Sequence, residues 1–255
     1  MKRIIIFTTA YLPFVGGAEL AVKEITDRLS PPEFSFDLIT LNLDRKQKPE
    51  EQIGNVRVIR LSCSKLLFPV RAFMRARSLH RSGPYDRVWS IMASHGGFAG
   101  LFFKYHFPKI PFILTLQEGD SLSHIYRRAF LLWPLFKRIF TYADTITAIS
   151  NYLANWAKKM GATCPIEVIP NGVNAEAFSV ERLAFSKKEE IRKKLGIRNE
   201  DKIIITTSRL VEKNAVGNII ESLHYLPEDV KLVICGTGPL ESNLKLTAKR
   251  CALNA

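Results

Sequence analysis

The stretch KRIIIFTTAYLPFVGGAELAVKEI, residues 2–25, decides the fold that we expect for this chain. It opens with an apolar, β-branched run that predicts a buried strand over residues 3–9. Gly16 and Gly17 follow, and residues 18–30 then have a helical pattern. A strand, a glycine turn and a helix in this order indicate the first unit of a parallel sheet that is covered by helices.

The same alternation continues through the first two thirds of the chain. Residues 1–178 are predicted to form a complete α/β domain, Rossmann-like and doubly wound, with helices on both faces of a parallel sheet. Further strands are expected at residues 36–42, 56–61, 87–92, 111–115, 144–148 and 166–169. Further helices are expected at residues 68–81, 97–106, 122–140 and 150–160, the last with Ser150 as its N-cap.

A second sheet begins after a connector rich in Lys and Glu, residues 179–201. Its expected elements are a connector helix at 187–195, strands at 202–207 and 230–235, and helices near 215–225 and from 239. Two strands leave unpaired sheet edges and little core. Residues 202–255 are therefore interpreted as an incomplete second Rossmann-like domain.

Polar segments follow three strands of the first domain, at the edge where open α/β sheets bind ligands. They are a glycine turn with Gly16, Gly17 and Glu19, a loop with Gln117 and Asp120, and a turn with Asn171 and Gly172. Glycines let a ligand approach the backbone, and a helix N-terminus attracts an anion. The structural alternatives stay open: a bare tight turn, a helix cap by Asp120, and a rigid exit turn at Asn171.

Cationic and glycine-rich loops follow the two strands of the second domain. Arg209 and Lys213 stand four residues apart after the first strand, and such a pair suits a diphosphate. A solvated pair of cations is the alternative. Gly236 and Gly238 follow the second strand and precede a helix.

Together these motifs resemble glycosyltransferase family 4 across essentially the whole chain. The residues that carry the resemblance are Gly16-Gly17-Ala18-Glu19, Ser150, the turn at Asn171-Gly172, Ser208 to Lys213, and Leu232 to Pro239. The resemblance implies a GT-B fold, with an acceptor-side domain followed by the start of a domain that binds a nucleotide-sugar.

The resemblance also implies a reaction: transfer of a sugar from a UDP- or GDP-sugar to an acceptor, with retention of configuration. Arg209 and Lys213 are the implied catalytic groups, because they would offset charge on the leaving diphosphate without a metal or other cofactor. The implied binding residues are Gly16, Gly17, Glu19, Gln117, Asp120, Asn171, Gly172, Gly236 and Gly238. The acceptor is expected to be a glycan or a lipid-linked molecule of envelope polysaccharide or glycolipid synthesis.

Two departures from the family pattern lower the expected activity. Gln117 stands where the family often has His, and an amide cannot carry a proton at neutral pH. The second-domain motif of two Glu separated by seven residues is missing. Glu181 and Glu189 show that spacing, but they lie in the connector and are interpreted as a coincidence. We therefore expect weak activity or none.

The formal net charge of +13 indicates an anionic partner. No acidic residue lies between Glu51 and Asp86, a stretch that contains Arg57, Arg60, Lys65, Arg71, Arg75, Arg77 and Arg81. Residues 64–82 and 125–142 mix cations with apolar residues. They are interpreted either as core helices with a solvated basic face or as segments that dock on an anionic membrane.

Two other function classes stay open: a non-catalytic or split-subunit sugar- or nucleotide-binding protein, and a basic nucleic-acid-binding protein. The second is disfavoured, so no nucleic acid is expected, because no nucleic-acid module is present. No apolar run reaches the roughly 20 residues of a membrane span. Four scattered cysteines predict reduced, buried thiols in a cytoplasmic protein, with peripheral attachment to the inner face of the membrane left open.

Overall fold

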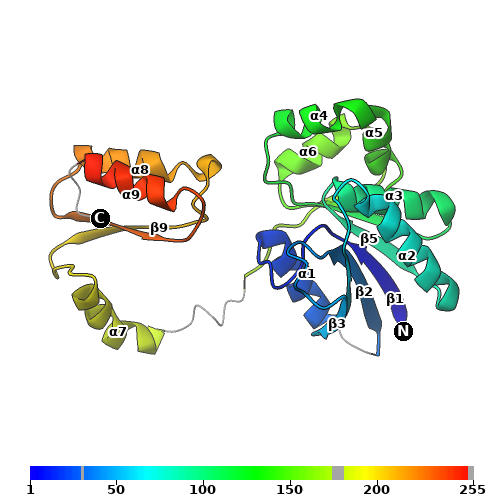
Figure 1. Cartoon of the computed structure of the whole chain (residues 1–255), viewed down its shortest axis with the longest axis horizontal. Coiled ribbons are helices and arrows are strands. Elements are labelled where there is room, and N and C mark those ends of the chain that lie inside the picture. The colour runs from blue at the N-terminus through cyan, green and yellow to red at the C-terminus, as the bar shows by residue number, and fades with distance from the viewer. Residues whose placement is uncertain (30–31, 174–180, 252–255) are drawn as a thin grey trace. The chain divides into compact units, whose positions relative to one another are not determined.

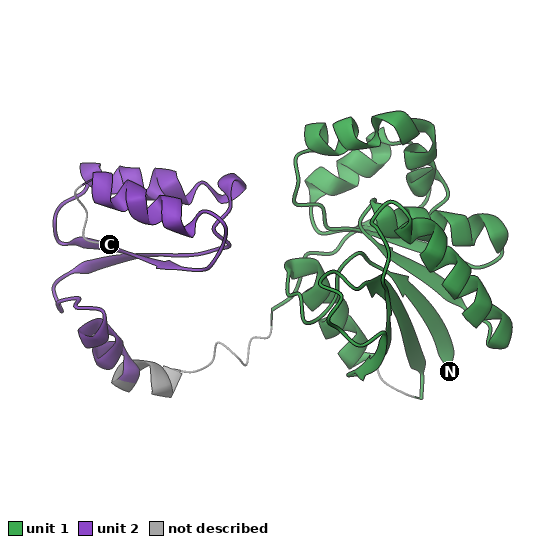
Figure 2. Ribbon diagram, viewed as in Figure 1, with its two compact units in different colours: residues 1–173 green, residues 174–255 purple. Residues whose placement is uncertain are grey.

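The computed structural model describes residues 1–29, 32–173 and 181–251. The chain divides into two compact units, Met1–Val173 and Asn174–Ala255, which Figure 2 colours green and purple. The predicted domain boundary at 178 lies outside the described residues. Each unit is described by itself.

The first unit is built on an eight-stranded sheet with the order β3-β4-β2-β1-β5-β6-β7-β8. Its strands are β1 (Lys2–Phe7), β2 (Phe34–Leu41), β3 (Glu50–Ile53), β4 (Val56–Leu61), β5 (Arg87–Ile91), β6 (Phe112–Leu116), β7 (Thr145–Ala148) and β8 (Ile166–Val168). All neighbours pair in parallel except β3 and β4. The predicted strands are confirmed, but β3 was not predicted, because its sequence EEQI is polar and too short to show a pattern.

The helices of this unit are α1 (Gly17–Arg28), α2 (Phe68–Ser82), α3 (His95–His106), α4 (Leu122–Ala129), η1 (Phe130–Leu132), α5 (Trp133–Thr141) and α6 (Asn151–Lys159). The expected single helix over 122–140 is wrong, because the chain forms α4, η1 and α5 there. Pro134, in the first turn of α5, has no N–H to continue the helical ladder. The predicted N-cap is confirmed, since the Ser150 hydroxyl accepts from Leu153 N at 3.4 Å.

Helices cover both faces of this sheet, as predicted (Figure 1). α1 packs Ala18 and Val22 against one face, beside Ile4 and Ile6 of β1. Helices α2, α3, α5 and α6 cover the other face. The central strand β1 lies between β2 and β5, so the direction of winding reverses there and places a ligand-binding edge at the carboxyl ends of β1 and β5.

The second unit contains a parallel pair of strands and several helices. Its elements are α7 (Glu181–Lys194), β9 (Lys202–Thr207), η3 (Glu212–Asn214), α8 (Val216–Ser222), η4 (Leu223–Tyr225), β10 (Val230–Cys235) and α9 (Glu241–Arg250). The two predicted strands are confirmed as strands but not as buried ones. Ile205, for example, is 62% exposed, because a two-stranded sheet covers little surface.

Arg192 and Asp201 tie α7 to β9. Arg192 Nη2 donates to the carbonyl oxygens of Arg198 at 2.7 Å and Asp201 at 2.7 Å. The nearly fully buried Asp201 carboxylate pairs with Arg198 at 2.8 Å, and this hydrogen bond holds the pKa of Asp201 below its ordinary value. Within the described residues, α7 therefore packs as a part of the second unit.

The prediction of buried thiols is wrong. The four cysteines are free, but Cys235 is exposed and the other three are half-buried. Cys235 ends β10, in the sparsely covered two-stranded sheet, which leaves its side chain open to solvent.

Candidate functional site

The glycine turn lies at the ligand-binding edge of the first unit. Gly16 is the N-cap of α1 and Gly17 is its first residue. A Cβ on Gly16 would lie 2.4 Å from Oε2 of Glu19, so the Glu19 carboxylate folds back over the turn. Around Gly17 there is open space within 4 Å, which leaves the backbone accessible to a ligand.

Gln117 and Asn171 are brought together from distant parts of the chain. Asn171 Nδ2 donates to Gln117 Oε1 at 3.3 Å, so the end of β6 is joined to the segment after β8. Gln117 is buried, whereas Asn171 and Gly172 are exposed. Two amides beyond the carboxyl ends of β6 and β8, which flank β7 in the sheet, can donate to and accept from the hydroxyls of a sugar.

Glu118 is a residue of this edge that the sequence analysis did not select. Its Oε1 accepts from Ala93 N at 2.5 Å, and its Oε2 is buried without a partner in the described structure. Burial raises the pKa of Glu118 to about 7, although hydrogen bonds from Ala93 and neighbouring backbone N–H groups partly offset that rise. Met92, just before Ala93, has a φ of 66°, a strained conformation for a side chain of this size.

Asp120 does not cap the following helix. Ser121 is the N-cap of α4, and its hydroxyl accepts from His124 N at 3.4 Å. The alternative of a purely capping Asp120 is therefore wrong. Asp120 is exposed, beside the buried Gln117 and the half-buried Glu118, at the same edge of the sheet.

The second unit places its cations on one folded loop. Arg209 follows β9, and Lys213 lies in η3, with both side chains exposed. Asn214 Nδ2 donates to the Arg209 carbonyl oxygen at 2.7 Å, which closes the loop so that it carries both cations. Exposed cations at the carboxyl end of a strand can bind a diphosphate.

The glycines after β10 are required by close contact with this cationic loop. A Cβ on Gly236 would lie 1.8 Å from the Ser208 carbonyl oxygen, and a Cβ on Gly238 would lie 2.3 Å from that of Leu210. Leu210 N donates to the Thr237 carbonyl oxygen at 3.0 Å. The structure thus brings together the predicted residues Arg209, Lys213, Gly236 and Gly238 at one edge of the second unit.

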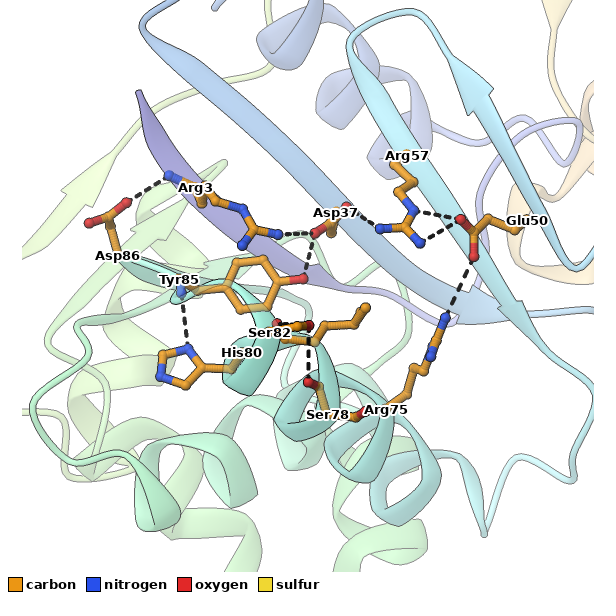
Figure 3. Close-up of polar contacts among 11 residues, drawn as sticks. Arg3, Asp37, Glu50, Arg57, Arg75, Ser78, His80, Ser82, Tyr85 and Asp86 are labelled. Carbon is orange, nitrogen blue, oxygen red and sulfur yellow. Dashed lines mark hydrogen bonds and ion pairs between the residues drawn. The ribbon is translucent and has the colours of Figure 1, made fainter.

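The arginines between Glu51 and Asp86 contribute less positive field than their number suggests (Figure 3). Arg57 pairs with Glu50 at 2.6 Å, and Arg75 approaches the same carboxylate at 3.6 Å. Arg60 pairs with Glu51 at 2.6 Å. The charge of these three arginines is therefore compensated locally, because β3 supplies the acidic partners.

The network in Figure 3 continues from Arg57, whose Nη1 lies 3.9 Å from Asp37 Oδ1, to a polar cluster around Asp37. Asp37 of β2 accepts from the Tyr85 hydroxyl at 2.5 Å and from Arg3 Nη2 at 3.1 Å. Burial and this hydrogen bond raise the pKa of Tyr85 well above its ordinary value. Arg3 stands near the amino end of β1, at the edge opposite the glycine turn, so this cluster ties strands together rather than forming the candidate site.

The described residues contain no group of three His, Cys, Asp or Glu side chains that could hold a metal ion. No helix within the described ranges is long and apolar enough to span a membrane.

Comparison with known families decides the classification. The model of Glycosyltransferase Family 4 matches residues 15–177, more than half of the chain. The chain belongs to glycosyltransferase family 4. A second model, Glycosyl transferases group 1, matches residues 187–255, so both parts of this family 4 chain are recognised and the predicted resemblance is confirmed.

Two curated relatives align with nearly all of the family 4 chain. It is 24% identical over 258 residues to an alpha-monoglucosyldiacylglycerol synthase of Streptococcus pneumoniae, covering 97% of the chain and 58% of that relative. It is 26% identical over 273 residues to the uncharacterized glycosyltransferase MJ1069 of Methanocaldococcus jannaschii, covering 96% and 66%. The chain therefore spans less than two thirds of the length of either relative.

Solved structures confirm the predicted fold. Anabaena HepE, crystallised with UDP and glucose, has a TM-score of 0.73 at 17% identity, over 100% of this chain and 67% of its own. A trehalose 6-phosphate synthase of Burkholderia multivorans has a TM-score of 0.72 at 12% identity, over 98% and 70%. At such identities the similarity shows the fold alone, which is the GT-B type.

Proposed function

We propose that this family 4 chain is the acceptor-side domain and part of the donor-side domain of a retaining glycosyltransferase that uses a nucleotide-sugar. The observation that carries the proposal is the packing of the Arg209–Lys213 loop against the Gly236–Gly238 loop in the second unit. Cations and a closely approachable backbone are what a sugar-nucleotide diphosphate requires. UDP is the favoured nucleotide, because the similar structure of HepE contains it.

In the proposed reaction, Arg209 and Lys213 stabilise the charge that develops on the leaving diphosphate. Arg209 supplies a planar fork of N–H donors and Lys213 a compact charge, so both act most strongly when the bond to the sugar breaks. No proton transfer from either side chain is needed, and the proposal includes no metal or other cofactor.

In the first unit, the proposed acceptor groups are the glycine turn and the amides of Gln117 and Asn171. Gly17 offers an open helix N-terminus, and the amides offer hydrogen bonds to hydroxyls. The Gln117 amide stays neutral near neutral pH. Acceptor binding by this side chain therefore depends on hydrogen-bond geometry and not on pH. The acceptor that we propose is a glycan or a lipid-linked sugar.

A membrane-bound acceptor is favoured by exposed apolar side chains in the first unit. Phe130 is 75% exposed and Leu131 is 89% exposed in η1. On the segment that leads into α2, Leu66 is 84% exposed, while the buried face of α2 is made by Phe68, Pro69, Ala72 and Ala76. Leu67, Val70 and Met74 are also exposed, whereas Phe73 packs against the core.

Cations flank both apolar segments. Arg127, Arg128, Lys137 and Arg138 are exposed on either side of η1, and no acidic residue lies in 121–143. Burial lowers the pKa of His95, and Arg128 and Lys65 lower it further, so α4 and the segment before α2 both bring positive charge to His95. Exposed apolar residues framed by cations suit an anionic leaflet, which we propose as the surface on which this unit docks.

Titration calorimetry of the chain with UDP-glucose, GDP-mannose and random-sequence DNA tests the function. The proposal requires saturable binding of one nucleotide-sugar. Salt-dependent binding of DNA without binding of either sugar nucleotide would overturn it in favour of the nucleic-acid alternative. Sugar-nucleotide binding by a chain whose full-length form transfers no sugar would favour the non-catalytic alternative.

A further inference from the structure

Arg60 is a buried cation at the ligand-binding edge of the first unit, on the face of the sheet that α1 covers. Its side chain is 1% exposed, although it stands in β4, one residue from the end of that strand. A buried arginine is rare unless its guanidinium is paired with an acidic group or hydrogen-bonded. The partners of Arg60 therefore indicate what the residue does.

The Arg60 guanidinium joins three separate segments. Nη1 pairs with Glu51 Oε1 of β3 at 2.6 Å and donates to the Lys48 carbonyl oxygen at 3.1 Å. Nη2 donates to the Leu12 carbonyl oxygen at 2.7 Å, across 48 residues of sequence. Charge-assisted hydrogen bonds of this length are among the strong ones in proteins.

The bond to Leu12 lies in the loop that connects β1 to α1. Upstream, Tyr11 is buried in the core below α1, and Thr8 N donates to the Ile39 carbonyl oxygen at 3.2 Å. Downstream, Phe14 and Val15 are exposed, and the glycine turn follows. Among the described contacts, Arg60 is therefore the last side-chain anchor before Gly16.

We propose that Arg60 is a positioning residue for the glycine turn, fixing the place at which Gly16 and Gly17 present the N-terminus of α1 to a ligand. Glu51 supports this role. Its carboxylate compensates the guanidinium charge and orients the guanidinium so that Nη2 can donate to the Leu12 carbonyl oxygen. The ligand in question is the acceptor of the proposed function, and that part rests on the proposed function.

Hydrogen–deuterium exchange on the whole chain tests the positioning directly. The test protein carries Arg60→Met with Glu51→Gln, so that no unpaired buried charge remains. We expect exchange of the hydrogen-bonded amides of Phe14 and Leu20, which donate to the carbonyl oxygens of Tyr11 and Gly16, to rise about tenfold, while amides of β1 and β2 keep their wild-type rates. A general loss of stability would instead raise all of these rates together.

The matched control is Arg57→Met with Glu50→Gln. Arg57 also lies in β4 and pairs with β3, but its described side-chain partners, Glu50 and Asp37, lie outside the β1–α1 loop. We expect unchanged exchange at Phe14 and Leu20 in this control. The conservative variant Arg60→Lys, which keeps the charge and loses the fork, should give an intermediate rate.

Unchanged exchange at Phe14 and Leu20 in the folded Arg60 variants would overturn the positioning role. If the double variant does not fold, Arg60→Lys alone decides, and a wild-type rate in it rejects the proposal. The exchange measurement uses no ligand, so its outcome does not depend on the proposed function. Absence of any UDP-glucose binding by the wild type would sink the proposed function and leave the exchange result standing.

Discussion

Glu118 Oε1 accepts a hydrogen bond from Ala93 N at 2.5 Å, and this bond joins the end of β6 to the turn that precedes α3. The other carboxylate oxygen is buried without a partner in the described structure. Glu118 thus places an acidic group at the N-terminus of a helix, where negative charge is favoured, but in a dry position, where it is not. Because burial is the largest effect, the pKa is raised to about 7.

The first prediction concerns the pH dependence of the first unit. The folded pKa of Glu118 lies above its ordinary value of 4.5, so its contribution to stability is complete below about pH 4.5 and is lost as pH rises through about 7. Glu118→Gln removes that loss. Relative to the wild type, the variant should gain up to about 3 kcal/mol in free energy of unfolding between about pH 4 and pH 8.

Urea unfolding at a series of pH values measures this difference. Glu33→Gln, which makes the same change at an exposed position, serves as the control. Parallel pH profiles for Glu118→Gln and the wild type would show that Glu118 is ionised at an ordinary pKa, contrary to the structure.

The second prediction concerns the glycine after β10. Gly236→Ala forces a Cβ to within 1.8 Å of a backbone oxygen, so the two loops of the second unit must separate. We expect a loss of about 1–3 kcal/mol in the stability of this unit, together with weaker nucleotide-sugar binding. Gly217→Ala in α8 is the matched control, because its Cβ would meet only Leu244 Cδ2 at 3.8 Å.

Alanine in a helix is more favourable than glycine by up to about 1 kcal/mol, so Gly217→Ala should be neutral or stabilising. Thermal unfolding followed by circular dichroism compares the two variants. Equal melting temperatures would mean that the loops after β9 and β10 do not pack as the structure shows.

The third prediction concerns the proposed membrane surface. Leu131→Ser, combined with Phe130→Ser, should reduce sedimentation with anionic phosphatidylglycerol vesicles by about tenfold, because each residue would insert apolar surface. Tyr225→Ser is the control, an 85% exposed aromatic residue of the second unit. We expect it to sediment like the wild type.

Replacing Arg127 and Arg128 with Gln should weaken binding to anionic vesicles and have little effect with neutral phosphatidylcholine vesicles. If the wild-type chain remains in the supernatant with anionic vesicles at low salt, the exposed segment at 130–132 has another role and the docking proposal is lost.

Most of the fold could be predicted from local patterns. Buried parallel strands appear in the sequence as continuous apolar runs. Ser150 indicates the start of α6, because serine is a preferred N-cap residue. The short polar strand β3 has no such pattern and was not predicted. Without β3, the acidic partners of Arg57 and Arg60 could not be recognised. Glu50 and Glu51 neutralise Arg57 and Arg60 only because β3 folds back antiparallel on β4.

The candidate site could likewise be predicted from the sequence only in part. Gly236 and Arg209 could be selected from their places after strands, because parallel strands end at one edge. Glu118 could not be ranked above its neighbours, since its burial depends on where the turn after β5 lies. In the sequence, Arg60 is one cation of a basic stretch. Only the folded structure, in which Arg60 donates to the Leu12 carbonyl oxygen, shows that it holds the β1–α1 loop.

The central claim is that the loop carrying Arg209 and Lys213 binds the diphosphate of a nucleotide-sugar. Calorimetric titration of UDP-glucose into the wild type, Arg209→Ala, Lys213→Ala and the exposed α9 control Lys245→Ala tests it most directly. We predict that each loop variant weakens binding about tenfold or more and that Lys245→Ala binds like the wild type. Equal affinity in all four proteins would contradict the account.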